Sequence, residues 1–340
     1  MKIGLITIFH VPNNGALLQC YALSTYLKGL GHEVFLYDVP FFQSLEWVHN
    51  LKERIFSRKM LKFIRTYLPH YTSDLSTQAD VYMVGSDQVW NPAIVMSQLG
   101  NYMLAFAPKG SKKVSYAASF GIDKLPDDIN TDEVANLLKD FQYITVRETS
   151  GVLICENQLG VKVNHVLDPT FLLKDYSEII GNESNRNESN NLVVYKLNYS
   201  YDWYLNAKSI AEQLGCKLKE LNGRRLKKSG DLHGFNVKDK SVREWLTAIA
   251  NAKYVITDSF HGCVFSIIFG KRFVIVPGIK SRSTRLTSLL ADLDLSDRIV
   301  NDFSDWKQVL QTPIDYEKVN QKLDVLRERC YSHLDLMLKN

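Results

Sequence analysis

Short apolar segments typical of strands alternate with helical segments along most of this chain. Residues 3–9 are apolar and β-rich, "HVPNNG" interrupts them, and apolar side chains then recur at steps of three and four from Ala16 to Leu30. A further strand pattern at 33–38 completes a β-loop-α-β unit, which we expect to be parallel and right-handed. The alternation therefore predicts an α/β protein with mostly parallel sheets.

The same pattern continues through both halves of the chain. In the first half it predicts strands near 80–84, 114–118, 144–148 and 163–168, with helices near 131–141 and 149–157. In the second half it predicts strands at 192–197, 216–221, 254–257 and 272–277, with helices near 201–214, 242–251 and 260–269. The second half thus repeats the architecture of the first.

Length and composition favour two domains. A chain of 340 residues is long for one hydrophobic core and comfortable for two. The stretch 181–191 ("GNESNRNESNN") has almost no apolar side chains and is typical of a flexible linker. We therefore predict an N-terminal Rossmann-like domain over 1–180, a linker over 181–191, a C-terminal Rossmann-like domain over 192–314, and a final helix over 315–340 that packs against the body.

Charge and cysteine usage indicate which kinds of partner, site and cellular compartment suit the protein. The chain has 41 Lys and Arg against 37 Asp and Glu, and the resulting net charge of +4 does not indicate nucleic acid as a partner. The five cysteines are odd in number, far apart and never spaced as Cys-x-x-Cys, so we predict neither a disulfide framework nor a metal site. The apolar run 3–9 is too short to span a membrane and lacks a cleavage site. These features predict a cytoplasmic protein.

Residues 47–68 interrupt the alternation with a basic amphipathic helix pattern. Apolar side chains from Trp47 to Leu68 alternate with Lys and Arg between Lys52 and Arg65. One interpretation is peripheral contact with an anionic membrane surface, which for a cytoplasmic protein is the inner face of the membrane. The interpretation we favour is a helix packed on the N-terminal domain, because charged outer faces are the norm for surface helices.

Five polar stretches directly follow predicted strands, at 10–16, 85–92, 146–151, 167–173 and 257–262. Ligands of open α/β sheets bind at the carboxyl ends of the strands, and the cleft between two such domains is the default active site. These stretches are therefore the first candidates for a functional site.

Most of these stretches also have a structural interpretation. A tight turn explains "NNG" at 13–15 as well as an anion site at a helix N-terminus does. Turn chemistry closed by Asn-Pro explains 85–92 as well as a sugar site does. In 146–151, a structural Arg147–Glu148 pair competes with an arginine that binds a carboxylate or phosphate through two hydrogen bonds.

The stretch "TDSFHG" at 257–262 leaves one side chain unexplained. Asp258 or Ser259 can cap the following helix, which ends at Gly270. Capping does not account for His261, whose pKa near neutrality suits a proton carrier, although a lone histidine is more often structural. The residues alone leave the role of His261 open.

Seven collinear stretches resemble signatures of the polysaccharide pyruvyl transferase family: "NNGALLQCYAL", "VGSDQVWNP", "SYAASFG", "VRETSG", "VLDPTFLL", "TDSFHGCVFSIIFGKRFVIV" and "STRLTSLL". The resemblance implies a GT-B-like fold, with two Rossmann-like domains facing across a cleft. It also implies a transferase that moves the carboxyethylidene group of phosphoenolpyruvate onto two hydroxyls of one sugar. The product would be a pyruvate ketal on a cell-surface polysaccharide, such as a capsule or exopolysaccharide, or on its precursor, with release of phosphate.

The resemblance also implies roles for particular residues. The family's histidine falls on His261, the expected general acid/base, and its strand-end arginine falls on Arg147. We expect Arg147 to bind the carboxylate or phosphate of phosphoenolpyruvate, with Lys280 and Arg285 as further anion ligands.

Two positions depart from the family pattern. Ser259 stands where some members carry an arginine, so the anion is expected to be bound elsewhere, with Arg285 as the substitute. Asn14 stands where many members carry an aromatic residue, which would alter acceptor contacts without changing the transfer chemistry.

The resemblance places phosphoenolpyruvate in the C-terminal domain and the acceptor, a sugar or lipid-linked oligosaccharide, in the N-terminal domain. The expected reaction requires no metal or redox cofactor. Two other functions stay open: a GT-B glycosyltransferase that uses a nucleotide sugar, and a non-catalytic glycan-binding protein. The candidate substrate-binding residues are Asn13, Asn14, Gly15, Gln19, Ser86, Asp87, Gln88, Glu148, Asp168, Asp258, Ser259, Lys280 and Arg285.

Overall fold

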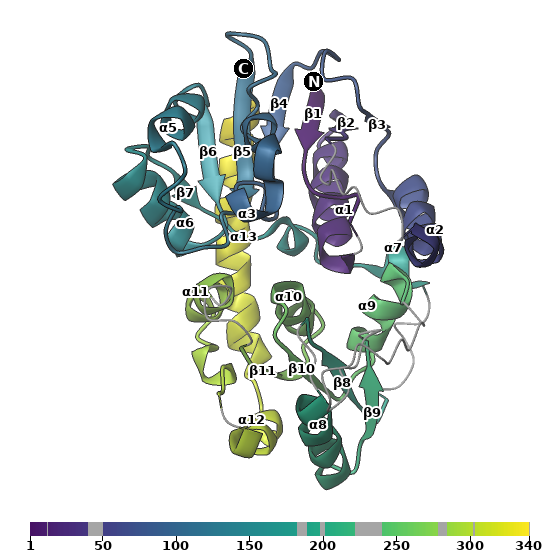
Figure 1. Cartoon of the computed structure of the whole chain (residues 1–340). Coiled ribbons are helices and arrows are strands. Elements are labelled where there is room, and N and C mark those ends of the chain that lie inside the picture. The colour runs from purple at the N-terminus through teal and green to yellow at the C-terminus, as the bar shows by residue number, and fades with distance from the viewer. Residues whose placement is uncertain are drawn as a thin grey trace. The chain divides into compact units, whose positions relative to one another are not determined.

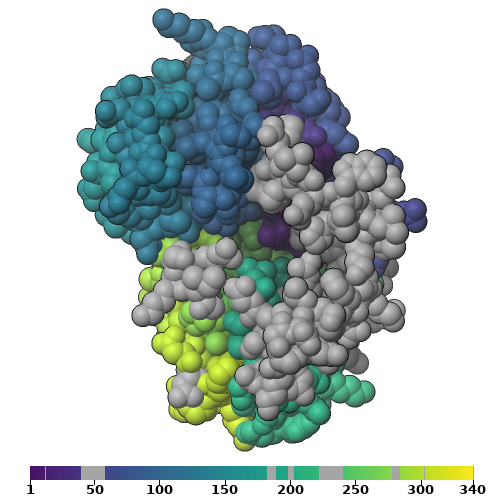
Figure 2. Space-filling model, viewed as in Figure 1, coloured from purple at the N-terminus to yellow at the C-terminus, as the bar shows by residue number. Residues whose placement is uncertain are grey.

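The chain forms two compact units in a computed structural model (Figure 1). Unit 1 is Met1–Leu173 together with Leu323–Asn340, and unit 2 is Lys174–Lys322. The structure describes residues 1–11, 13–39, 50–181, 189–197, 201–221, 240–277, 284–301 and 303–339, with the side chains of 50–57 and 201–202 left out. Figure 2 draws the remaining residues in grey.

Unit 1 is built on a parallel sheet that has seven strands among the described residues, in the order β3-β2-β1-β4-β5-β6-β7. The central strand β1 pairs with β2 on one side and β4 on the other, so that Leu5 lies between Leu36 and Met83. The strand order reverses between β1 and β4, the position where open α/β sheets bind ligands. The strands are β1 (Lys2–Ile6), β2 (Glu33–Tyr37), β3 (Tyr71–Thr72), β4 (Val81–Val84), β5 (Lys112–Ala118), β6 (Tyr143–Val146) and β7 (Asn164–His165).

Helices cover the unit 1 sheet (Figure 1). The helix after β1 begins at Asn14 because the side chain of Asn13 accepts hydrogen bonds from the first free backbone amides. The buried rings of Phe35, Trp90 and Phe120 belong to one hydrophobic core between sheet and helices. The helices are α1 (Asn14–Gly29), α2 (Asn50–Tyr67), α3 (Pro92–Val95), α4 (Leu99–Tyr102), α5 (Thr131–Lys139) and α6 (Thr149–Leu153), with helical turns at Met96–Gln98, Ile154–Gln158 and Pro169–Phe171.

Unit 2 repeats this architecture on a smaller sheet, whose described strands are all parallel and run in the order β11-β10-β8-β9. Its core includes Trp203 and Trp306, whose ring centroids are 4.9 Å apart, and Trp245 against Phe265. The strands are β8 (Asn191–Tyr195), β9 (Lys217–Glu220), β10 (Tyr254–Thr257) and β11 (Arg272–Ile275). The helices are α7 (Ser177–Ile180), α8 (Tyr201–Gln213), α9 (Val242–Ala250), α10 (Phe260–Ile268), α11 (Thr284–Asp292) and α12 (Trp306–Gln311), with turns at Ser296–Arg298 and Phe303–Asp305.

The last helix, α13 (Tyr316–Leu338), starts in unit 2 and ends in unit 1. Arg327 and Tyr331 donate hydrogen bonds to the carbonyls of Phe171 and Leu172, and Sγ of Cys330 accepts one from the amide of Leu167. The helix therefore fixes the loop that follows β7. Both chain ends lie at the amino edge of the unit 1 sheet, where the backbone of Lys339 accepts a hydrogen bond from Lys112 at the start of β5.

The division into units differs in its bounds from the domains predicted from sequence. The prediction ended the first domain at 180, but residues 174–181 belong to unit 2, where Tyr176 packs on Phe265 and Arg243 donates to the carbonyl of Ile180. The predicted linker 181–191 relied on composition, and residues 182–188 of it lie outside the described residues. The final helix is divided because its residues from Leu323 pack on unit 1.

The predicted basic helix at 47–68 corresponds to α2. Of its described side chains, Phe63 and Ile64 are buried, and the rings of Phe63 and Tyr67 contact Tyr21 of α1. These contacts agree with a helix packed on the N-terminal unit, and Lys62 and the other described basic side chains face solvent. Within the described residues, no helix combines the length and the apolarity that crossing a membrane requires.

A glycine in unit 2 allows α10 to pack closely on the end of β10. A Cβ atom on Gly262 would lie 2.4 Å from Oγ1 of Thr257, which itself accepts a hydrogen bond from the amide of Ser259. We expect Gly262→Ala to lower the free energy of unfolding by about 1–3 kcal/mol, since the strand end must shift to relieve the overlap.

Urea unfolding followed by tryptophan fluorescence measures this effect, because Trp203, Trp245 and Trp306 all lie in unit 2. The control is Gly29→Ala at the end of α1, where a Cβ atom meets nothing within 4 Å and alanine favours the helix. Equal stability of Gly262→Ala and the parent protein would contradict the close packing.

Candidate functional site

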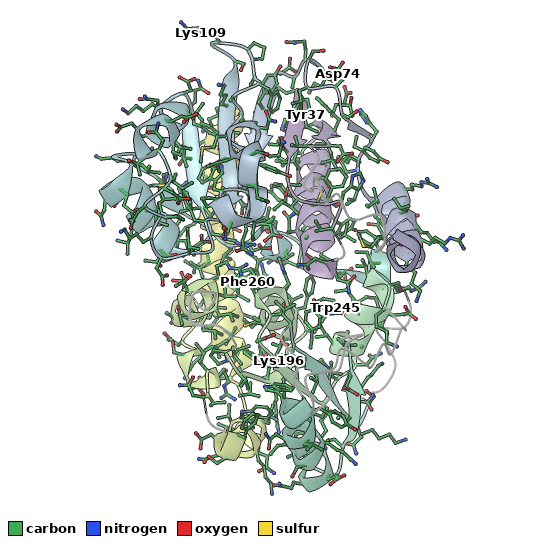
Figure 3. All side chains as sticks on the ribbon, in the orientation of Figure 1. Tyr37, Asp74, Lys109, Lys196, Trp245 and Phe260 are labelled. Atoms are coloured by element: carbon green, nitrogen blue, oxygen red, sulfur yellow. The ribbon has the colours of Figure 1, made fainter. Side chains whose placement is uncertain are left out.

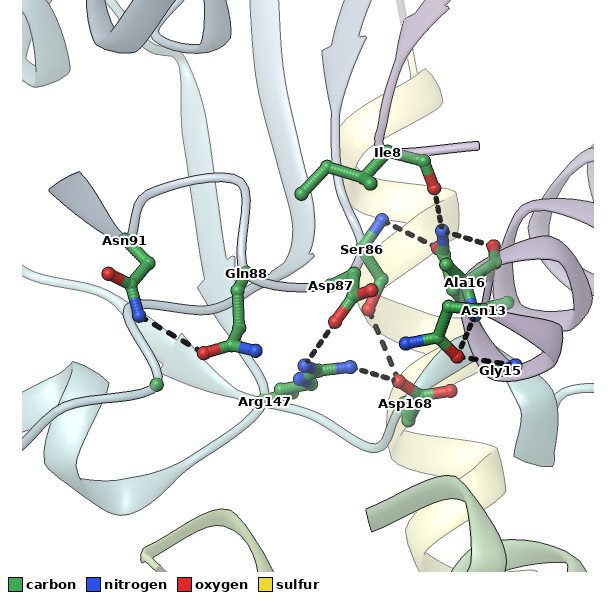
Figure 4. A network of polar contacts seen from close by, with 12 residues as sticks. Ile8, Asn13, Gly15, Ala16, Ser86, Asp87, Gln88, Asn91, Arg147 and Asp168 are labelled. Carbon is green, nitrogen blue, oxygen red and sulfur yellow. Dashed lines mark hydrogen bonds and ion pairs between the residues drawn. The ribbon is translucent and has the colours of Figure 1, made fainter. Parts of the chain in front are cut away.

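The carboxyl edge of the unit 1 sheet is organised around Arg147 (Figure 4). Arg147 directly follows β6, and its side chain is 0% exposed. Nη1 lies 2.7 Å from Oδ2 of Asp168, and Nη2 lies 2.8 Å from Oδ1 of Asp87. Nε lies 3.8 Å from Oε2 of Glu148. One guanidinium thus joins the loops that follow β4, β6 and β7.

Arg147 stays charged in spite of its burial. Desolvation alone would lower its pKa, but the charges of Asp87, Asp168 and Glu148 more than offset this, and the pKa is raised above the ordinary arginine value. An ion pair this deeply buried needs its full set of partners, because each charge is costly to bury alone.

The carboxylates around Arg147 also hold the backbone of their own loops. Oε1 of Glu148 accepts hydrogen bonds from the amides of Phe120 and Gly121, at 2.9 and 3.2 Å. Oδ1 of Asp168 caps the turn that follows it by accepting from the amide and hydroxyl of Thr170, at 3.0 and 2.6 Å. Both side chains are buried and act on the protein itself.

Gln19, a residue of α1, connects this cluster to the segment that follows β1. Its Oε1 accepts a hydrogen bond from the amide of Ser86 at 3.1 Å, and its Nε2 donates to Oγ1 of Thr7 at 2.9 Å. The hydroxyl of Thr7 in turn donates to the carbonyl of Ser86, and the hydroxyl of Ser86 donates to Asp168 at 3.3 Å. Gln19 and Ser86 are fully buried, so both predicted substrate ligands lie inside the network.

The predicted role of Arg147 as an anion ligand stays a prediction, because its partners in this geometry are carboxylates of the protein itself. Asp87 and Asp168 hold the two ends of the guanidinium, where a phosphate or carboxylate of a ligand would compete with them. The structural alternative considered for Arg147 and Glu148 describes the arrangement better, although Asp87 and Asp168 are the closer partners.

The turn at 13–15 also agrees with its structural interpretation. Oδ1 of Asn13 accepts hydrogen bonds from the amides of Gly15 and Ala16, at 2.9 and 3.4 Å, which uses the side chain as the cap of α1. Asn14 is half-buried at the first position of the helix. Gln88 likewise has a protein partner, since its Oε1 accepts from Nδ2 of Asn91 at 3.0 Å.

In unit 2, a buried ion pair holds the carboxyl ends of β8 and β10 together. Nζ of Lys196, labelled in Figure 3, lies 3.1 Å from Oδ2 of Asp258 and 4.9 Å from the ring centre of Trp203. Oδ1 of Asp258 accepts from the amide of Leu197 at 2.7 Å. Asp258 therefore has structural partners directly after β8 rather than a capping role. The sequence did not single out Lys196, and its one signal was a lysine at the end of an apolar strand.

The first turn of α10 places His261 at the same edge of unit 2. Ser259 caps the helix by accepting from the amide of Gly262 at 3.3 Å, as one of the sequence interpretations predicted. His261 is buried, with 5% of its surface exposed, and its ring lies edge-on to Phe260. On α11, Cζ of Arg285 lies 5.5 Å from the ring centre of Phe260.

His261 and Arg285 thus gather at the first turns of α10 and α11. Each is the second residue of its helix, where unpaired amides and the helix dipole favour negative charge. Both contact the ring of Phe260, the first residue of α10. Lys280, also predicted to bind an anion, lies outside the described residues.

Comparisons with known proteins agree on family and fold. Residues 13–278 match the sequence model of the polysaccharide pyruvyl transferase family. No curated protein sequence matches the chain. The structure is similar to Arabidopsis thaliana UGT89C1 complexed with UDP-L-rhamnose, with a TM-score of 0.53 and 12% identity, covering 99% of this chain and 98% of that one.

Two further solved structures give the same result. The spinosyn forosaminyltransferase SpnP has a TM-score of 0.50 at 12% identity, and the glycotransferase of kitacinnamycin has a TM-score of 0.50 at 14% identity. Each match covers 98% of this chain and 95% of the other. At such identities the likeness shows the fold, which is the predicted GT-B fold of two α/β domains.

The structural role of Arg147 can be tested by removing its charge. Arg147→Met keeps most of the side-chain volume but leaves the buried carboxylates of Asp87 and Asp168 without their cation. We expect the free energy of unfolding to fall by about 3–5 kcal/mol, measured by urea unfolding followed by circular dichroism.

The matched control is Lys124→Met in the same unit, which removes the exposed Lys124–Asp127 pair, with side chains 70% and 89% exposed. Its unfolding midpoint should stay close to that of the parent protein, because exposed ion pairs contribute little. If both variants behaved alike, Arg147 would not be holding the loops together.

Proposed function

This chain belongs to the polysaccharide pyruvyl transferase family, and on that premise we propose that it moves the carboxyethylidene group of phosphoenolpyruvate onto two hydroxyls of one sugar residue. The product is a cyclic pyruvate ketal on a cell-surface polysaccharide or its precursor, and phosphate is released. One observation carries the proposal: residues 13–278, which match the family's model, include His261, which lies in the first turn of α10 directly after β10.

Unit 2 supplies the side chains proposed for the donor. Phosphoenolpyruvate carries a carboxylate and a phosphate, and the first turns of α10 and α11 favour both. Arg285 is the proposed anion ligand, because a guanidinium donates paired hydrogen bonds to such groups. Lys280 stays a second proposed ligand. Ser259 caps α10, so it supports the anion site through the helix rather than replacing the missing arginine.

His261 serves as general acid and base in the proposed reaction. It first protonates the methylene carbon of phosphoenolpyruvate, which leaves a cationic C2. One sugar hydroxyl adds to C2 and loses its proton, and the bond from C2 to the phosphate oxygen then breaks. The second hydroxyl adds to the resulting cation and loses its proton, which closes the ketal. The scheme needs no metal or redox cofactor.

We propose a positioning role for Arg147 in place of direct contact with the donor. Arg147 fixes the loop of Ser86 and Asp87 against Asp168 at the carboxyl edge of unit 1.

Unit 1 is the proposed acceptor side, and the acceptor is a sugar or a lipid-linked oligosaccharide. The proposed location is the cytoplasm at the inner face of the membrane, with the exposed basic side chains of α2 as the proposed membrane contact. Nucleic acid is not a proposed partner.

A glycosyltransferase is the second candidate function. The GT-B fold supports it, since the solved structures with this fold include an enzyme complexed with UDP-L-rhamnose. The two candidates differ in the leaving group. Phosphate release from phosphoenolpyruvate supports pyruvyl transfer, and nucleotide release from a nucleotide sugar supports glycosyl transfer. Glycan binding without either product would indicate a non-catalytic protein.

Replacing His261 tests the acid/base assignment. We expect His261→Gln to lower turnover by about 10²–10⁴-fold, because no side chain then protonates the methylene carbon. Phosphate release and mass spectrometry measure ketal formation on methyl β-D-galactoside, methyl β-D-glucoside and N-acetylmannosamine. The control is His70→Gln, an exposed histidine of unit 1. Near-normal turnover by a folded His261→Gln enzyme would remove this residue from the mechanism.

Replacing Arg285 tests the donor site. We expect Arg285→Met to raise the KM for phosphoenolpyruvate by about 10- to 100-fold, in line with the ~1.5–3 kcal/mol of a hydrogen bond to a charged group. Steady-state phosphate release gives the KM. Arg272→Met is the matched control, because Arg272 is exposed at the amino end of β11 in the same unit. An unchanged KM for Arg285→Met would place the anion site elsewhere, with Lys280 as the next residue to test.

A further inference from the structure

A histidine and an aspartate lie together at the carboxyl edge of the unit 1 sheet. His10 follows β1, Asp38 follows β2, and Nδ1 of His10 lies 2.8 Å from Oδ1 of Asp38. Because β1 and β2 pair in parallel, both loops leave the sheet at the same edge. The side chains are 31% and 25% exposed, so solvent and small molecules reach both. We call this pair the His10–Asp38 dyad.

Two aromatic rings hold the imidazole of the dyad in place. The ring centroid of Phe9 lies 4.3 Å from that of His10, and Tyr71 meets His10 edge-on at 5.0 Å and 87°. When Nδ1 donates to a carboxylate, the neutral imidazole carries its proton on Nδ1 and a lone pair on Nε2. The contacts therefore orient a base at Nε2, and Asp38 stabilises the imidazolium that forms when this base takes up a proton.

The dyad adjoins the polar network of unit 1. The strand order β2-β1-β4 places the loop of His10 between Asp38 and the loop of Ser86. Gln19 joins the two sides, since its Nε2 donates to the carbonyl of Ile8 at 3.3 Å and its Oε1 accepts from the amide of Ser86. The segment before His10 is thus fixed to the edge where this sheet reverses its strand order and where α/β sheets bind ligands.

A structural role explains the dyad poorly. Arg147 and Lys196 show how this protein holds its strand ends, with ion pairs whose cationic side chains are at most 5% exposed. The dyad is far more accessible, and exposed ion pairs contribute little to stability. An accessible imidazole oriented by a carboxylate suits proton transfer instead.

We propose that His10 is the general base for one of the two acceptor sugar hydroxyls, with His261 serving the other, and that Asp38 positions His10. As the bond from the hydroxyl oxygen to the donor carbon forms, the O–H bond breaks and its proton passes to Nε2 of His10. The imidazolium pairs with Asp38 and later returns the proton to solvent. The identity of the donor rests on the proposed function, whereas the base serves transfer to any sugar hydroxyl.

Kinetics separate the dyad from the donor site. We expect His10→Gln to lower kcat by about 10²–10⁴-fold with the same three sugar acceptors, since one of the two hydroxyls then has no base. Calorimetric affinity for phosphoenolpyruvate and the unfolding midpoint should stay unchanged. His70→Gln is the matched control. A kcat equal to that of the parent enzyme would overturn the proposal, as would a loss explained by weaker donor binding.

The positioning role of Asp38 has a readout of its own. Nitrogen NMR of the imidazole in the intact chain should show the Nδ1–H tautomer of His10, with the resonance assigned by its absence from His10→Gln. In Asp38→Asn this preference should be lost and kcat should fall. An Nε2–H tautomer in the parent protein, or an unchanged kcat in Asp38→Asn, would overturn the dyad.

Failure of the proposed function would look different. A parent enzyme that forms no ketal from phosphoenolpyruvate, but transfers a sugar from a nucleotide sugar, contradicts pyruvyl transfer. The role of His10 as a base is then tested in the glycosyl transfer reaction. There, a large loss of kcat in His10→Gln supports the dyad, and a parental kcat overturns it.

Discussion

One buried guanidinium determines the arrangement of the carboxyl edge of unit 1. Arg147 is enclosed by Asp87, Asp168 and Glu148, which come from three separate loops. The charged side chains depend on one another, because a buried cation is tolerated only beside carboxylates and a buried carboxylate only beside a cation or hydrogen-bond donors. Each loop therefore has one stable position relative to the others, and the edge that α/β sheets use for ligands becomes a fixed surface.

Unit 2 follows the same principle with other residues. Lys196 and Asp258 join the ends of β8 and β10, and Ser259 then caps α10. His261, two residues further on, is held at the start of that helix. In both units, buried pairs hold the strand ends, and neighbouring side chains such as His10 and His261 are the ones proposed for chemistry. The polar residues at the strand ends therefore form two groups, those that hold the loops in place and those proposed for chemistry.

The sequence predicted the fold well because strand and helix periodicities are local properties. The helix predicted near 131–141, for example, is Thr131–Lys139, and the strand predicted at 254–257 is Tyr254–Thr257. Short helices such as Trp306–Gln311 carried too little periodicity to be predicted. At the site, sequence placed polar side chains at strand ends but not their directions, so Gln19 was predicted to bind substrate although it is buried.

Side-chain pairing explains what the sequence could not show. His10 and Asp38 are 28 residues apart, and parallel pairing of β1 and β2 brings them together.

Pyruvyl transfer to a sugar can be measured directly by mass spectrometry of sugar acceptors incubated with the enzyme and phosphoenolpyruvate in deuterated water. We expect an acceptor that gains one ketal-linked pyruvate with a deuterium in its methyl group. An acceptor left unchanged by phosphoenolpyruvate but glycosylated by a nucleotide sugar would contradict pyruvyl transfer.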